Sequence, residues 1–217
     1  MQRYASRFNA VEINSSFYRP HLPRTYERWA QSVPSTFRFS VKVPKRISHE
    51  LRLQRCETAL DEFLEHCLQL REKLGCLLIQ LPPSLSYEPA IASAFFTALR
   101  QRFAGTVVLE PRHASWLAAE VMLQEFEIGR VAADPAVIET GGTPGGWRGV
   151  HYWRLHGAPR IYHSAYGLEQ VQAWARSMAQ ATDAGILTWC IFDNTASGHA
   201  TPDALSLLDL YPQHFQA

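Results

Sequence analysis

The segment FRFSVKVP, residues 37–44, carries the pattern on which the predicted fold depends. Apolar side chains occupy every second position, and Arg38, Ser40 and Lys42 lie between them. Successive side chains of a β-strand point to opposite faces, so this alternation predicts a strand with one apolar and one polar face. Pro44 then ends the run at a position where a missing backbone donor does little damage to a sheet.

Similar extended runs recur along the chain, with helical patterns between them. Residues 59–74, 91–103 and 168–178 carry apolar residues at the i, i+3, i+4, i+7 spacing of amphipathic helices. Strands that alternate with helices are typical of a parallel sheet built from βα units. The seven predicted strands are Phe8–Asn14, Phe37–Pro44, Cys76–Leu81, Thr106–Arg112, Gly129–Asp134, Tyr152–His156 and Leu187–Asn194. The glycine-rich residues 141–146 lack the order of a nucleotide-binding motif, and we expect a flexible loop there.

Length and composition favour a single domain over residues 1–217. The chain is 47% apolar and 19% charged, which is ordinary for a globular protein with one core. Its net charge of +1 gives no bulk attraction to a polyanion. No apolar stretch reaches the length of a membrane span and no signal peptide is recognisable, so we expect a cytoplasmic protein with no membrane contact. The four cysteines form no C-x-x-C pair, which favours reduced structural thiols, and no metal site is predicted.

Polar side chains gather at the carboxyl ends of the predicted strands. In the first strand, for example, Glu12 and Asn14 share the face opposite Val11 and Ile13. The carboxyl ends of parallel barrel strands converge on one mouth, where enzymes of that architecture place their active sites. We therefore expect these polar side chains to meet. They are Glu12, Asn14, Lys42, Gln80, Glu110, Arg112, Asp134, Arg154, His156 and Asn194.

The near balance of acids and bases in this set leaves two interpretations open. The charges either form a structural ion network that binds nothing, or they hold an anionic ligand. In the second case Glu12 or Glu110 would act as general base and His156 as general acid. The cations that would hold a carboxylate or phosphate are Lys42, Arg112 and Arg154. The remaining ligand-binding side chains would be Asn14, Gln80, Asp134 and Asn194.

Several of these residues lie in motifs that resemble the YecE-like family, also called domain of unknown function 72. The resemblance extends over nearly the whole chain, through VEINSSFY at 11–18, ISH at 47–49, QLPP at 80–83, EPRHASW at 110–116 and RLHG at 154–157. It implies a TIM-barrel fold with a pocket at the carboxyl ends of the strands, but it supplies no reaction and no cofactor. The chain is also distantly similar to barrels of the endonuclease IV and xylose isomerase type, a likeness of fold alone.

The chain departs from the family pattern at three places. Asp193 stands where the family usually has Asn, and Pro111 where it usually has an aromatic residue. The family's opening strand, a Gly-Thr-Ser-Gly-Trp-like segment, has no counterpart here. Seven strands do not close an eight-stranded barrel, so we expect an incomplete barrel with two unpaired edges. Those edges would be covered by the chain's own termini, by a partner chain in an oligomer, or by tighter closure.

Three kinds of function fit these observations. The first is an enzyme, a hydrolase, lyase or isomerase, that acts on a small phosphorylated or carboxylated compound. The second is a nucleic-acid-binding protein whose affinity would fall steeply with salt, and its basic residues would be Lys42, Lys45, Arg46, Arg52 and Arg55. The third is a non-catalytic protein that binds a metabolite in the same pocket.

Overall fold

The structure is a computed structural model that describes residues 2–210, and it has a mixed α/β architecture. The strands are β1 Ala10–Ile13, β2 Arg38–Lys42, β3 Leu74–Gln80, β4 Val107–Glu110, β5 Ile128–Arg130, β6 Ala132–Asp134, β7 Gly145–Gly146, β8 Val150–Leu155 and β9 Leu187–Phe192. The α-helices are α1 Gln2–Ala5, α2 Pro23–Gln31, α3 Glu57–Cys67, α4 Pro89–Arg100, α5 Glu120–Glu125, α6 Leu168–Asp183 and α7 Ala200–Leu210. Shorter helical turns cover Ser15–Phe17, Arg46–Glu50, Leu68–Lys73 and Ala114–Ala119.

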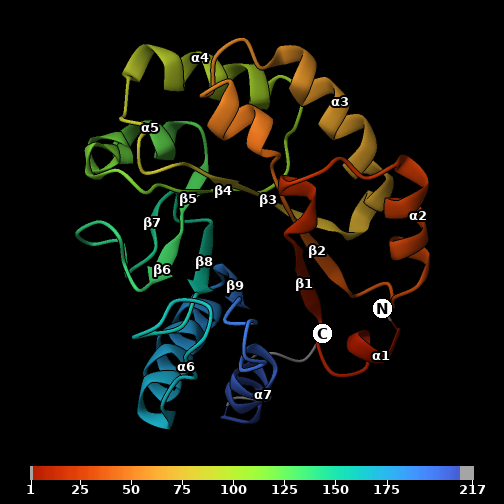
Figure 1. Ribbon diagram of the computed structural model, residues 1–217, viewed down its shortest axis with the longest axis vertical. Helices are drawn as coiled ribbons and strands as arrows, with labels where there is room; N and C mark the ends of the chain where they lie inside the picture. Colours follow the sequence, from red (N-terminus) through yellow and green to blue (C-terminus); the bar gives the residue numbers. More distant parts are fainter. Residues whose placement is uncertain (1, 211–217) are drawn as a thin grey trace.

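The strands form two sheets, ordered β1-β2-β3-β4-β5-β7 and β6-β8-β9. Every pairing except β5 with β7 is parallel, which confirms the predicted α/β class with mostly parallel strands. Figure 1 shows the strands in an arc with the larger helices on its outside. This arrangement gives each strand an outer face toward the helices and an inner face toward the other strands.

The fifth predicted strand, residues 129–134, is divided between the two sheets. Residues 128–130 pair with β4, whereas residues 132–134 pair with β8. Val131 lies between them and donates its backbone N–H to Leu109 at 2.9 Å. Alternation along the sequence gives no sign of this division, because a strand that changes partners keeps its period of two.

The glycine-rich segment is more ordered than predicted. Gly145 and Gly146 pair antiparallel with β5 as strand β7. Gly146 has a φ of +65°, and a Cβ there would lie 2.5 Å from the Ile128 carbonyl oxygen. Only glycine tolerates both the positive φ and the close backbone approach, so the residue that suggested flexibility is the one that permits pairing.

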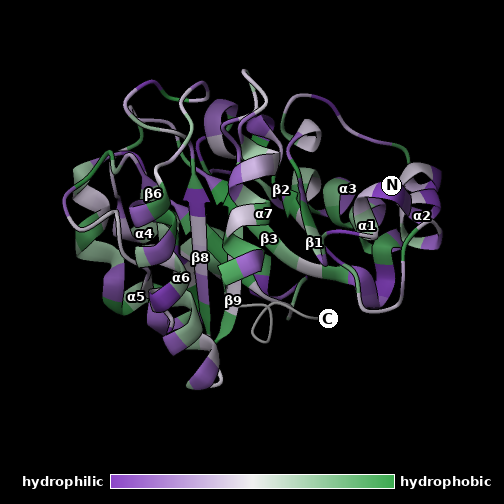
Figure 2. Ribbon diagram, turned by 90° about the horizontal axis from the view of Figure 1, so that it is seen from below, coloured by the Kyte–Doolittle hydropathy of each residue, from purple (hydrophilic) through white to green (hydrophobic). Residues whose placement is uncertain are grey.

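The two faces of the strands bury separate apolar clusters. Outward-facing residues such as Phe39, Val41 and Leu77 pack with the apolar stripes of the surrounding helices. Inward-facing residues such as Leu78 and Tyr152 form a second cluster inside the arc. In Figure 2 the head of β8 is hydrophilic, whereas the strands behind it are mostly hydrophobic. The inner cluster therefore gives way to polar side chains toward the carboxyl ends of the strands.

The arc has an open side between its first and last strands. Over residues 2–210, β1 pairs only with β2 and β9 pairs only with β8. Figure 1 shows β1 and β9 facing each other across this side. β9 is mostly half-buried, unlike the interior strands β3 and β4. No helix in the described part of the chain is long and apolar enough to cross a membrane.

Candidate functional site

The centre of the site is the guanidinium of Arg154, near the carboxyl end of β8. Its Nη2 lies 2.8 Å from Glu12 Oε1 and 2.9 Å from Asp193 Oδ2, and its Nη1 lies 2.5 Å from Glu110 Oε2. Arg154 is only 1% exposed. Because three carboxylates from different strand ends converge on one buried cation, the charge of Arg154 is more than balanced locally.

Glu110, at the end of β4, is the second node of the network. Gln80 Nε2 donates to both carboxylate oxygens at 3.0 Å, and Arg112 Nη2 donates to Oε1 at 2.8 Å. Burial alone raises the pKa of Glu110, but the charges of Arg154 and His156 outweigh burial and hold that pKa well below its ordinary value. Glu110 is therefore ionised at neutral pH and serves as an acceptor.

His156 connects two of these carboxylates. Its Nδ1 lies 2.7 Å from Asp193 Oδ1, and its Nε2 lies 3.5 Å from Glu110 Oε1. Nε2 is buried and makes no hydrogen bond with any residue that the structure describes. Burial lowers the pKa of the imidazole, but the Asp193 and Glu110 carboxylates outweigh burial and raise that pKa above its ordinary value. His156 is thus a buried imidazole held between two carboxylates.

Lys42, the last residue of β2, is a buried cation of a different kind. Its Nζ lies over the ring of Phe17, 4.1 Å from the centroid. No carboxylate within residues 2–210 is in ion-pair range of Nζ. Burial, followed by the neighbouring Arg154 charge, lowers the pKa of the Lys42 ammonium to about 8. A cation–π contact compensates only part of the lost hydration of an ammonium.

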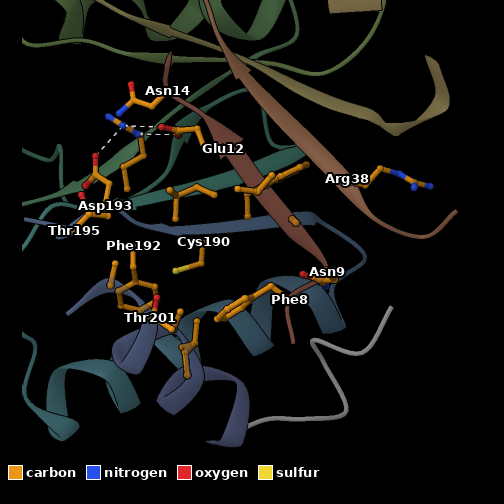
Figure 3. A pocket seen from close by; sticks show the side chains of 18 of the residues that line it. Phe8, Asn9, Glu12, Asn14, Arg38, Cys190, Phe192, Asp193, Thr195 and Thr201 are labelled. Atoms are coloured by element: carbon orange, nitrogen blue, oxygen red, sulfur yellow. Dashed lines mark hydrogen bonds and ion pairs between the residues drawn. The ribbon is translucent and has the colours of Figure 1, made fainter. Parts of the chain in front are cut away.

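A cavity of about 1000 Å³ connects this cluster with the open side of the arc. Its charged end is lined by Glu12, Asn14, Lys42, Gln80, Arg154 and Asp193. Its apolar end is lined by residues such as Phe8, Leu187, Phe192 and Leu207. Figure 3 shows Glu12, Asn14 and Asp193 together at one end, with Phe8, Cys190 and Phe192 farther along. A bound molecule would thus meet charge at one end and apolar surface at the other.

The structure brings together eight of the ten predicted site residues, in two layers. Five line the cavity, namely Glu12, Asn14, Lys42, Gln80 and Arg154. Three contact these from behind and do not line the cavity, namely Glu110, Arg112 and His156. Two of the predicted catalytic residues, Glu110 and His156, therefore reach a bound molecule only through a neighbour.

The other two predicted residues lie outside the ion network. Asn194 Nδ2 donates to Ser164 O at 2.9 Å and to Asp203 Oδ2 at 2.7 Å, so its side chain ties a loop to α7. The main-chain oxygen of Asp134 accepts from His156 N at 2.7 Å, but no ion pair joins its carboxylate to the cluster within the described residues. The predicted meeting of all ten side chains is corrected at these two positions.

The residue that the sequence analysis left out of the site is Asp193. The register pairs Arg154 with Ile191, so Asp193 falls on the same inward face two residues later. One signal in the sequence could have identified Asp193 as a site residue, because it stands where the family usually has Asn. No group of three His, Cys, Asp or Glu side chains with metal-binding geometry occurs in residues 2–210.

Comparisons with known proteins agree on one family. The profile of the family called "Protein of unknown function DUF72" matches residues 1–217. The UPF0759 protein YecE of Escherichia coli K12 is 35% identical over 82 residues, a match that spans 38% of this chain and 30% of YecE. The UPF0759 protein YunF of Bacillus subtilis 168 is 23% identical, over 97% of this chain and 86% of YunF.

Solved structures show the same fold. The DUF72 family protein EF0366 from Enterococcus faecalis V583 matches with a TM-score of 0.83 and 23% identity, over 97% of this chain and 92% of that one. The DUF72 family protein TM1631 from Thermotoga maritima MSB8 matches with a TM-score of 0.77 and 22% identity, over 94% and 85% of the two chains. These likenesses establish a shared fold and leave the chemistry to the site itself.

Proposed function

The chain belongs to the DUF72 family of proteins of unknown function, and we propose that its pocket binds a small carboxylated or phosphorylated compound and transfers a proton to or from it. The observation that carries this proposal is the environment of Lys42. A buried ammonium faces the cavity and has no carboxylate in ion-pair range among the described residues. An anion in the cavity would supply the missing counter-charge.

Two arginines extend this attraction. Arg112 pairs with Glu110 through Nε and Nη2, and its side chain is partly exposed. Arg154 lines the cavity. Guanidinium groups bind carboxylates and phosphates, so Arg154 would contact an anion whose charge Lys42 attracts, whereas Arg112 adds positive charge from behind Glu110. Asn14 and Gln80, at the same end of the cavity, would accept or donate the remaining hydrogen bonds.

Glu12 and Asp193 are the carboxylates that face the same end of the cavity. We assign Glu12 as the general base, because it lines the cavity directly while Glu110 lies behind Arg154. His156 would act as the acid through Asp193, to which it is joined by the 2.7 Å contact. In this assignment Glu110 is a positioning residue that holds Arg154 and favours the protonated form of His156.

The fold supports a finer proposal as well. We propose that the parallel strands occupy seven adjacent positions of an incomplete (β/α) barrel, with β5 and β6 sharing one position around Val131. The facing edges of β1 and β9, with the cavity between them, support this arrangement. Hydrogen exchange tests it, because amides on the open edges of β1 and β9 should exchange much faster than those of β3. Equal protection, together with a dimer in sedimentation, would mean that a second copy covers the edges.

The hypothesis of a nucleic-acid-binding protein depends on basic residues that follow β2, and two of these are already paired with carboxylates. Lys45 pairs with Glu50 at 3.3 Å, and Arg46 pairs with Glu62 at 3.2 Å. These contacts make this segment a weaker phosphate-binding surface than the sequence suggests. Nucleic-acid binding would be detected as affinity for single- or double-stranded oligonucleotides that falls steeply with salt. A metabolite-binding protein would bind small anions with no turnover.

Calorimetric titration with inorganic phosphate and a panel of small carboxylates tests the proposed function. We expect binding to weaken at least about tenfold in Lys42→Met, which removes the unbalanced charge. Lys45→Met is the matched control, because it removes a lysine three residues away whose ammonium is already paired and exposed. Equal affinity in wild-type and Lys42→Met protein, or no binding of any anion to the wild type, would overturn the proposal.

A further inference from the structure

The chain has 21 basic Lys and Arg residues, of which only three are lysines, and the three lie in different surroundings. Lys73 Nζ is buried and donates to the carbonyl oxygens of Ala30 and Val33 at 2.6 and 2.7 Å. Lys45 is exposed and paired with Glu50. Lys42 is the lysine of the cavity, with neither arrangement. Lys42 is therefore a basic residue of the cavity that, unlike an arginine, is able to lose its proton.

Two features around Lys42 favour the neutral amine. Its stem is buried among the inner face of the sheet and the ring of Phe17, which removes water from the ammonium. The nearest charges of the same sign, on Arg154 and Arg112, disfavour protonation, while Glu12 and Glu110 favour it less strongly than burial opposes it. Desolvation and neighbouring cations are the means by which lysine nucleophiles are activated in proteins.

We propose that Lys42 is the nucleophile of this pocket and forms an imine with the carbonyl group of a small anionic carbonyl compound, a 2-oxo acid or a phosphorylated aldehyde or ketone. This inference rests on the proposed anion-binding function and adds the substrate class. Arg154, with Asn14 and Gln80 at the same end of the cavity, would hold the anionic group, and the carbonyl carbon would lie against Lys42 Nζ. The apolar end of the cavity would accommodate the rest of the molecule.

The step needs no oxidant, reductant or further reactant. The lone pair of the neutral Nζ attacks the carbonyl carbon, a C–N bond forms, and the C=O π electrons move to oxygen. One N–H proton passes to that oxygen, which gives a carbinolamine. The second N–H proton then passes to the hydroxyl, which leaves as water while the C=N bond forms. Glu12, which also lines the charged end of the cavity, would carry these protons between nitrogen and oxygen.

Arginine at position 42 separates the proposed roles of the side chain. Lys42→Arg keeps a cation in the cavity, so anion affinity should fall less than in Lys42→Met. A guanidinium stays protonated in proteins, so imine formation should be lost. Retained anion affinity also reports that the variant is folded with an intact pocket, and circular dichroism provides a second check.

Reductive trapping tests the inference on the intact protein. Wild-type protein is incubated with pyruvate, glyoxylate or pyridoxal 5′-phosphate, reduced with sodium borohydride, and digested for mass spectrometry. The three lysines are compared within each sample. At neutral pH we expect at least about tenfold more adduct on Lys42 than on Lys45 with at least one probe, because a far larger fraction of Lys42 is unprotonated. Lys42→Arg should abolish that adduct and leave the trace at Lys45 unchanged.

The outcomes distinguish this inference from the function on which it rests. Labelling of Lys42 that never exceeds labelling of Lys45 with any of the three probes overturns the inference. If phosphate and lactate, which have no carbonyl group that forms an imine, still bind in the calorimeter, the anion-binding proposal survives that result. If neither adduct nor anion binding is found, both proposals fail.

Discussion

Arg154 and Lys42 are two buried cations at the same end of the sheet, and they stand in opposite situations. Arg154 is 1% exposed and Lys42 is 4% exposed, and both line the same cavity. Arg154 is held by Glu12, Glu110 and Asp193, whereas Lys42 has a ring beneath it and no carboxylate in range over residues 2–210. The paired guanidinium ties strand ends together. The unpaired ammonium costs stability, which is typical of groups retained for binding or catalysis.

Removal of Arg154 should produce the largest loss of stability. In Arg154→Met, two buried carboxylates, Glu12 and Glu110, and the partly buried Asp193 lose their shared counter-charge, and we expect a destabilisation of about 3–5 kcal/mol, measured by urea unfolding. A loss below about 1 kcal/mol would mean that solvent or other cations already balance these carboxylates. Such a result would remove the contrast between the two cations.

Removal of Lys42 should instead increase the free energy of unfolding at neutral pH. The folded pKa of about 8 lies below the ordinary value of 10.5, so the unfolded state binds more protons between these pH values. Stability should therefore rise as pH increases from about 8 to 10.5, and at pH 7 the buried ammonium costs roughly 3 kcal/mol. Lys42→Met should be more stable than the wild type at pH 7 and should lack this rise. Urea unfolding at pH 7 and pH 10 measures both, and parallel curves for the two proteins would contradict the unpaired state of Lys42.

The stability that His156 contributes should depend on pH less strongly than the stability cost of Lys42. It should fall, rather than rise, as pH increases. Its pKa is raised in the folded state, so the stability contributed by the imidazolium is fully present below the ordinary value of 6.5. That contribution is lost as pH rises through the folded pKa. His156→Gln should lack the loss, and NMR titration of the His156 ring in the wild type should report protonation that persists above pH 6.5. A ring that is neutral at pH 6 would place His156 outside the charged network.

The exposed ion pair between Arg46 and Glu62 should matter least. Their contact at 3.2 Å lies in solvent, and exposed pairs contribute little because water and salt screen them. We expect Arg46→Met to change the free energy of unfolding by less than about 0.5 kcal/mol. This variant is the reference for Arg154→Met, since both remove one paired arginine. A larger effect would show that burial is not what separates the two pairs.

Much of the site could be predicted from alternation along single strands. Glu12, Lys42 and Arg154 share inward faces because a period of two persists through each regular strand, and their convergence followed from parallel strands pointing the same way. Asn194 was placed wrongly because it has the parity of Cys190 and Phe192, which pack toward α6 and α7, and its side chain bonds Asp203 of α7. Asp193 has the inward parity of Ile191, and its backbone N–H still bonds Leu155 in the manner of the strand.

The order of the residues is enough to predict which side chains face inward and at which end of the strands the polar ones gather. Both are local consequences of backbone geometry and the order of the residues. That Arg154 pairs with all three carboxylates and Lys42 with none over residues 2–210 followed from the packing of the strands against one another. Which carboxylate pairs with which cation depends on the register between strands that are distant in sequence. A shift of a few ångströms is enough to make or break an ion pair inside a protein, because the interaction energy of two charges depends on their separation.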